Sequence, residues 1–181
     1  HLYVFDGASD HDLGAVAAMP LTLEGRAGYN IDNLAAASLA AFALGVPAAT
    51  IARIAARFGR DHADNPGRLQ RWRFGALQVV IDYAHNPDGL RQVLDAVLGE
   101  GARNPSARSG RLGMVLSHAG NRLESDLREV AATVAGYRPE LVVLKDIEGY
   151  ARGRADGEVA QILRDELQRQ GLSAAQTPWI A

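Results

Sequence analysis

The sequence has 181 residues, a formal net charge of −2 and an apolar content of 48%. This length suits one globular domain or slightly more, and the apolar content supports a hydrophobic core. The near balance of 19 basic and 21 acidic residues argues against a nucleic-acid binder, because no net charge attracts phosphate. No apolar run reaches the roughly 20 residues that span a bilayer, and the absence of cysteine excludes disulfides and thiolate metal sites. A cytoplasmic protein without a membrane partner is the default prediction.

The first third of the chain is predicted to contain short strands followed by two helices. Turn residues between apolar runs predict strands over residues 1–25, including an edge strand at 19–23. Apolar residues at helical spacing then predict one helix that ends near residue 44 and a second that opens at Pro47. We expect Asn30 or Asp32 to cap the first helix.

A polar segment over residues 60–67 is the predicted linker between two domains, because it ends in the turn-forming sequence Asn65-Pro66-Gly67. A β-hairpin is predicted next, with strands at 69–74 and 77–82 around a Gly75-Ala76 turn.

From residue 77 onward, strand patterns alternate with helix patterns. Predicted strands at 77–82, 112–117 and 141–144 are each followed by a stretch with apolar residues at helical spacing. This rhythm predicts right-handed crossovers and a parallel sheet, so the predicted fold class is α/β with a Rossmann-like C-terminal domain.

Polar residues follow each of these three strands, at 82–86, 117–122 and 145–154. The carboxyl ends of parallel strands share one edge of a sheet, and ligands bind at that edge. We therefore expect any chemistry to lie there. The segment Asp82-Tyr83-Ala84-His85-Asn86-Pro87 is the strongest candidate, since a carboxylate, a phenol and an imidazole meet at a strand end. Its structural alternative is an ordinary helix start, with Asn86 as the cap and Pro87 in the first turn.

Three segments together resemble the Mur ligase and folylpolyglutamate synthetase superfamily. Residues 82–88 match the Asp-Tyr-Ala-His-Asn-Pro-Asp opening of its C-terminal domain, and residues 65–69 match its Pro-Gly-Arg-Leu linker. Residues 28–36 are similar to the Gly-x-His-Asn-x-x-Asn-x-Leu-Ala-Ala helix entry of its central domain. A further set of segments, from Asn121 to Glu129 and from Leu144 to Ala160, resembles the Mur-like C-terminal ligase domain of the cyanophycin synthetases.

The resemblance implies an ATP-dependent, amide-forming ligase that works through an acyl phosphate, with ATP and Mg²⁺ as cofactors and an amino acid or peptide as substrate. Phosphoryl transfer of this kind needs fixed positive charge around developing negative charge. By the resemblance, nucleotide binding falls to Asn30, Arg68, Asp82 and Tyr83. Catalytic roles fall to His85 and Asn86, and substrate binding to Asn121, Arg122, Lys145 and Arg154. No metal ligand is assigned.

The sequence contains no Gly-x-x-x-x-Gly-Lys-Ser/Thr loop to cradle a triphosphate. The chain begins at His1, inside an apolar alternation, and we expect it to be part of a longer polypeptide. Residues 1–64 are then the tail of a central ATPase domain, and residues 65–181 the C-terminal Rossmann-like domain. The P-loop and most of the ATP and Mg²⁺ contacts are expected upstream, so the chain alone is expected to be inactive.

Several alternatives stay open at this point. Asn30 could act only as a helix cap, Arg68 could be a solvated linker residue, and Lys145 could form a surface ion pair with Asp146. The whole protein could instead be a UDP-muramoyl-peptide or folylpolyglutamate-type ligase, or a non-catalytic Rossmann-like binding module, and homo-oligomerisation is open. His11, His62 and His118 lack metal-ligand spacing and are interpreted as having no functional role.

Overall fold

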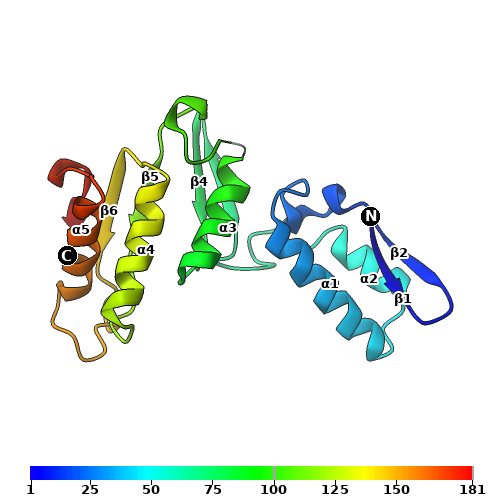
Figure 1. Ribbon diagram of the computed structural model, residues 1–181. Helices are drawn as coiled ribbons and strands as arrows, with labels where there is room; N and C mark the ends of the chain where they lie inside the picture. The colour runs from blue at the N-terminus through cyan, green and yellow to red at the C-terminus, as the bar shows by residue number, and fades with distance from the viewer. Residues whose placement is uncertain (100, 181) are drawn as a thin grey trace. The chain divides into compact units, whose positions relative to one another are not determined.

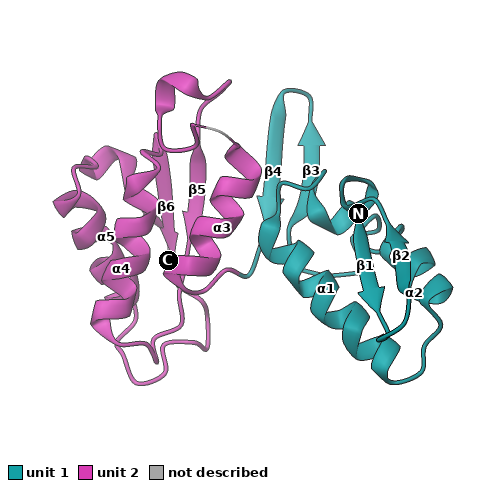
Figure 2. Cartoon of the chain, turned by 45° about the vertical axis from the view of Figure 1, so that its right-hand side comes forward, with its two compact units in different colours: residues 1–83 teal, residues 84–181 magenta. Residues whose placement is uncertain are grey.

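The computed structural model describes residues 1–99 and 101–180. The chain forms two compact units, residues 1–83 and residues 84–181, coloured teal and magenta in Figure 2. The predicted linker at 60–67 lies within the first unit, and the assignment of residues 1–64 and 65–181 to two domains remains a prediction. None of the described helices is long and apolar enough to cross a membrane.

The first unit combines two antiparallel hairpins with two helices (Figure 1). Its elements are β1 (Leu2–Phe5), β2 (Asp10–Gly14), the 3₁₀ turns η1 (Val16–Ala18) and η2 (Pro20–Thr22), α1 (Gly28–Ala43), α2 (Ala48–Ala55), β3 (Gln70–Phe74) and β4 (Leu77–Ile81). The β3–β4 hairpin is confirmed, with Phe74 paired to Leu77 and Gly75 at φ +61° in the turn.

Two local predictions in this unit were wrong. Residues 19–23 do not form a strand, because Thr22 is fully buried and its hydroxyl donates to the carbonyls of Val16 and Met19 at 2.7 and 2.9 Å, which stabilises the 3₁₀ turns. Neither Asn30 nor Asp32 caps α1. That helix begins at Gly28, with Ala27 as an N-cap that makes no side-chain bond.

The second unit has an α/β architecture, as predicted. Its elements are α3 (Pro87–Leu98), η3 (Pro105–Ala107), β5 (Gly113–Leu116), α4 (Glu124–Gly136), β6 (Leu141–Lys145), α5 (Glu158–Arg169), η4 (Ala174–Gln176) and β7 (Trp179–Ile180). Strands β5, β6 and β7 form a parallel sheet in that order. This sheet and its helices fit the predicted Rossmann-like C-terminal domain.

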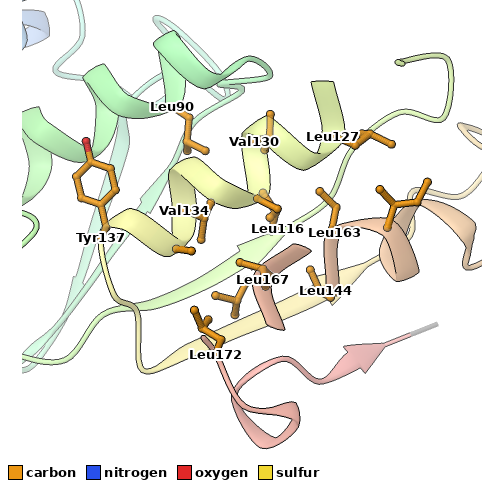
Figure 3. Close-up of a cluster of buried hydrophobic side chains, with 14 of the residues drawn as sticks. Leu90, Leu116, Leu127, Val130, Val134, Tyr137, Leu144, Leu163, Leu167 and Leu172 are labelled. Atoms are coloured by element: carbon orange, nitrogen blue, oxygen red, sulfur yellow. The ribbon is translucent and has the colours of Figure 1, made fainter. Parts of the chain in front are cut away.

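The core of this unit lies between the sheet and α3, α4 and α5 (Figure 3). Alternation along β6 buries Val142 and Leu144 completely, and the α4 residues Leu127 and Val134 are also fully buried. Burial of each such aliphatic side chain contributes about 1.5–3 kcal/mol, so this face holds the strand ends in fixed positions.

Local contacts are found at both ends of α5 (Glu158–Arg169). The Glu166 carboxylate is only 1% exposed and accepts from Arg169 at 2.6 Å and from Gln170 at 2.7 Å. The bond from the Arg169 guanidinium lowers the pKa of Glu166 below its usual value. At the other end of the helix, Gly157 adopts φ +81°, and a Cβ there would lie 2.6 Å from the Trp179 ring.

Candidate functional site

The loops that follow β5 (Gly113–Leu116) and β6 (Leu141–Lys145) are bonded to each other in the second unit. The Gly120 N–H donates to the Tyr150 carbonyl at 2.9 Å. Arg154 donates from Nε to the Gly120 carbonyl at 3.0 Å and from Nη2 to the Arg122 carbonyl at 3.1 Å. The two loops therefore form one rim at the carboxyl ends of the strands, as the strand–helix alternation predicts.

Gly120 is the point of closest approach between these loops. A Cβ at this position would lie 1.9 Å from the Ala151 carbonyl oxygen, which is far inside van der Waals contact. The backbone of the β5 loop can meet the β6 loop only because residue 120 has no side chain.

Arg154 is directed into the structure and is not simply solvated. Its guanidinium also bonds to the Glu158 carboxylate, so it bridges the β5 loop and the start of α5. The Asp146 carboxylate accepts from the Gly157 N–H at 2.7 Å at the same helix start. That carboxylate takes the place that a bound anion would occupy at this helix end.

The other three predicted substrate-binding residues lie at the surface of this rim. Asn121 and Arg122 are exposed in the β5 loop, and Lys145 is exposed at the end of β6. These side chains are therefore accessible to a ligand. Their role in substrate binding remains a prediction.

The segment that precedes α3 (Pro87–Leu98) carries the two predicted catalytic residues. Asn86 is the N-cap, as predicted, since its Oδ1 accepts from the Gly89 N–H at 2.7 Å. His85 is exposed, and its carbonyl lies 2.9 Å from Nε2 of His118. A carbonyl oxygen can only accept, so this nitrogen of His118 carries the proton.

His118 differs from its sequence interpretation, which gave it no role. It lies two residues after the end of β5 and is only 8% exposed. Its ring joins the β5 loop to the segment before α3, across 33 residues of sequence. Its spacing in the sequence gives no metal motif, and no other sequence signal announces this contact.

The predicted nucleotide-binding residues cluster in the first unit. Asp82 accepts from the Leu69 N–H at 2.8 Å, next to Arg68. The Arg68 guanidinium carbon lies 5.2 Å from the centroid of the Tyr83 ring, which is 62% exposed. A cation, an aromatic face and a carboxylate are thus presented together.

The start of α1 lies within electrostatic reach of this cluster. Asn30 is buried and donates from Nδ2 to the Leu21 carbonyl at 2.9 Å, so its amide is already engaged inside the fold.

Among the described residues, the buried Tyr29 hydroxyl has no hydrogen-bond partner. Burial raises the pKa of Tyr29 to about 12, the Asp82 carboxylate adds to this rise, and Arg68 opposes it. An unpaired buried hydroxyl is costly, and it could bond to a ligand group.

A cavity of about 280 Å³ lies on one side of this cluster, and its lining includes Arg60, Asn65 and Arg68. His62 also lines the cavity and is held in place: its Nε2 donates to the Arg71 carbonyl at 3.0 Å, and its ring lies edge-on to Trp72 with centroids 4.4 Å apart. The basic lining suits an anionic ligand.

Residues 1–99 and 101–180 contain no group of three or more His, Asp or Glu side chains that could hold a metal ion.

Residues 67–179 match the family model "Mur ligase, glutamate ligase domain". Cyanophycin synthetase of Synechocystis sp. is 29% identical over 175 residues, which are 97% of this chain and 19% of that protein. Cyanophycin synthetase of Crocosphaera subtropica is 31% identical over 165 residues, 91% of this chain and 18% of that protein.

The likeness extends to a second kind of ligase. UDP-N-acetylmuramoyl-L-alanyl-D-glutamate–2,6-diaminopimelate ligase of Xanthomonas oryzae pv. oryzae is 33% identical over 139 residues, 75% of this chain and 25% of that protein. The chain thus spans about a fifth to a quarter of the length of these relatives. With more than half of its residues matched by the family model, this chain belongs to the Mur ligase family.

Proposed function

We propose that this chain is the C-terminal part of an ATP-dependent carboxylate–amine ligase of the cyanophycin synthetase type. The observation that carries the proposal is the grouping of Arg68, Asp82 and Tyr83 next to the unpaired Tyr29 hydroxyl. Their chemistry suits a nucleoside polyphosphate, whose phosphates need a cation and whose base or ribose needs an aromatic face and an acceptor. The likeness to cyanophycin synthetases, which runs through both units, supports it.

The reaction has two steps. A carboxylate oxygen of the acceptor takes the terminal phosphoryl group of ATP, and ADP leaves. The amine nitrogen then attacks the acyl carbon, phosphate leaves with its bonding electron pair, and the amine gives up a proton. Negative charge develops on the transferring phosphoryl oxygens, so fixed cations aimed at them lower the barrier.

Each predicted residue has a place in this scheme. We assign the phosphates to Arg68 and the ribose side to Asp82 and Tyr83. Asn30 was predicted to contact the adenine, but its buried bond to the Leu21 carbonyl favours a role in holding the start of α1. Catalytic roles are assigned to His85 and Asn86, which precede α3 in the second unit.

The rim of the second unit receives the amine substrate in this proposal. Asn121, Arg122 and Lys145 are exposed there and can bind its carboxylate. Arg154 was predicted to bind substrate directly. Its bonds to the carbonyls of Gly120 and Arg122 favour a role in holding that loop.

ADP release by the full-length protein tests this function. The protein is supplied with ATP, an aspartate-rich peptide and each amino acid in turn, and we expect ADP release that depends on both peptide and amino acid. Arg68→Ala should abolish most of the turnover, whereas Arg111→Ala, which changes an exposed arginine outside the site, should not. Absence of any amino-acid-dependent ADP release would contradict the proposal.

The similarity to the diaminopimelate ligase favours one alternative, a ligase that extends a UDP-muramoyl peptide. The same assay distinguishes the two, because ADP release would then require the UDP-muramoyl peptide and diaminopimelate. We also propose that the chain alone does not turn over ATP, since its sequence has no phosphate loop. Calorimetry with ATP on residues 1–181 checks this, and tight binding would instead favour a binding module.

A further inference from the structure

We propose that His118 is a positioning residue that fixes the peptide group of His85 and thereby sets where the His85 imidazole lies. The inference rests on the proposed function only in the role that it gives to His85. The contact itself is a property of the fold: a buried ring at the end of β5 bonded to a backbone carbonyl before α3.

The His118 ring is oriented by contacts at both of its nitrogens. Both nitrogens of His118 lie near carbonyl oxygens, Nε2 at 2.9 Å from His85 O and Nδ1 at 3.3 Å from Ala119 O. The shorter contact identifies Nε2 as the donor to the His85 carbonyl. Because the ring is buried, loss of this bond would leave the N–H without a solvent partner, and a buried donor without a partner is costly. The ring therefore stays oriented toward the His85 carbonyl.

A pair of anchors holds the backbone around His85. On its C-terminal side, Asn86 is held by its capping bond from Gly89 and by the Leu90 N–H, which donates to the Asn86 carbonyl at 3.0 Å. The His85 carbonyl itself is held by His118. The backbone is thus fixed at and beyond residue 85, while the His85 side chain remains exposed.

The consequence follows from the geometry of catalysis. A displacement of about 1 Å in a reacting group can lower the rate by roughly 100-fold, even when the change is made at another residue. His118 has no side-chain route to the surface comparable to that of His85, since it is 8% exposed. It therefore acts through the His85 backbone and does not touch the substrate.

Three substitutions separate this role from simple packing. His118→Gln places an amide N–H near the position of Nε2 and should keep the bond. His118→Asn reaches only as far as Nδ1, and His118→Ala removes the donor. The matched control is Tyr137→Phe, which removes another buried donor of this unit, the hydroxyl that donates to Asp95 at 2.6 Å and to the Arg91 carbonyl at 3.2 Å.

The first measurement is amide hydrogen exchange of residues 85–89 in the full-length protein. We expect exchange at residues 85–89 to be about 10-fold faster or more in His118→Ala and His118→Asn, and near-native in His118→Gln. In Tyr137→Phe we expect no change in exchange at these residues, although its melting temperature should fall about as much as that of His118→Ala. Unchanged exchange in His118→Ala, or a Gln variant no better than the Asn variant, would overturn the proposal.

The second measurement is steady-state ADP release by the same variants. The Ala and Asn variants should lower kcat by roughly 10- to 100-fold with little change in the KM for ATP, and His118→Gln should recover most of it. If His118 had a purely structural role, the variants would lose stability without this selective fall in kcat. If the native protein releases no ADP at all, the proposed function fails, while the exchange experiment still decides whether His118 positions His85.

Discussion

Gly120→Ala should destabilise the second unit by several kcal/mol, although the substitution adds a single methyl group. Its Cβ would lie 1.9 Å from the Ala151 carbonyl oxygen, about 1.5 Å short of the 3.4 Å at which ordinary contact begins. Separation of the loops breaks the bonds from Gly120 N to Tyr150 and from Arg154 to the Gly120 carbonyl. Two lost hydrogen bonds at about 0.5–1.5 kcal/mol each, with overpacking at about 1–3 kcal/mol, give roughly 2–6 kcal/mol.

Urea unfolding measures this effect in one unit at a time. Trp179 lies in the second unit and Trp72 in the first, so a Trp72→Phe background leaves a fluorescence signal from the second unit alone. Gly113→Ala is the matched control, because a Cβ there meets nothing within 4 Å. A loss below about 1 kcal/mol for Gly120→Ala, or one equal to that of Gly113→Ala, would refute the reasoning.

Three further outcomes are expected. Arg68→Ala and His85→Ala should lower ligase turnover at least about 10-fold. The free energy of unfolding should fall by under about 1 kcal/mol, because both side chains are exposed. A loss of melting temperature as severe as the loss of turnover would show that both residues are structural. The pKa of Glu166 is lowered in the folded state, so the Glu166 carboxylate stabilises the fold fully above pH 4.5 and loses this effect as the pH falls through the folded pKa. The difference in melting temperature between pH 7 and pH 3 should therefore be smaller in Glu166→Gln than in the native protein, and equal differences would contradict this. The pKa of Tyr29 is raised to about 12, so the protonated Tyr29 hydroxyl stabilises the fold fully below pH 10 and loses this effect between pH 10 and 12. When tyrosine ionisation is followed by ultraviolet absorbance, Tyr29→Phe should lack the absorbance change of one tyrosine near pH 12, and an absorbance curve equal to that of the native protein would count against this.

Local sequence signals were sufficient for much of the fold. The β3–β4 turn follows from Gly75, and the start of α3 from Asn86 and Pro87, because each residue fixes its own backbone conformation or caps its own helix. The parallel pairing of β5 with β6 follows from the alternation of strand and helix patterns. The predicted first strand of that sheet, at 77–82, was wrong in this respect, because β4 pairs antiparallel with β3 and is not part of the parallel sheet. The wrong edge strand at 19–23 has the opposite cause: the buried Thr22 hydroxyl bonds to carbonyls of the preceding turn, which propensity does not show.

The meeting of the loops after β5 and β6 was predictable from the sequence, but their internal contacts were not. The residues that follow β5 and β6 do meet at one rim, where Asn121, Arg122 and Lys145 lie, whereas Arg68, Asp82 and Tyr83 belong to the first unit. Sequence alone could not show that Arg154 donates to two backbone carbonyls more than 30 residues away, or that His118 bonds to His85. Such contacts depend on tertiary packing and leave no periodicity or spacing in the sequence.

The contact between Trp179 and Gly157 links two positions that should have changed together during evolution. The indole ring fills the space that a side chain at 157 would need, and the positive φ of Gly157 leaves asparagine as the main alternative. In homologues with a small residue at position 179, glycine at 157 should therefore be replaced by asparagine more freely. Substitutions at positions 157 and 179 should therefore be correlated in an alignment of homologues.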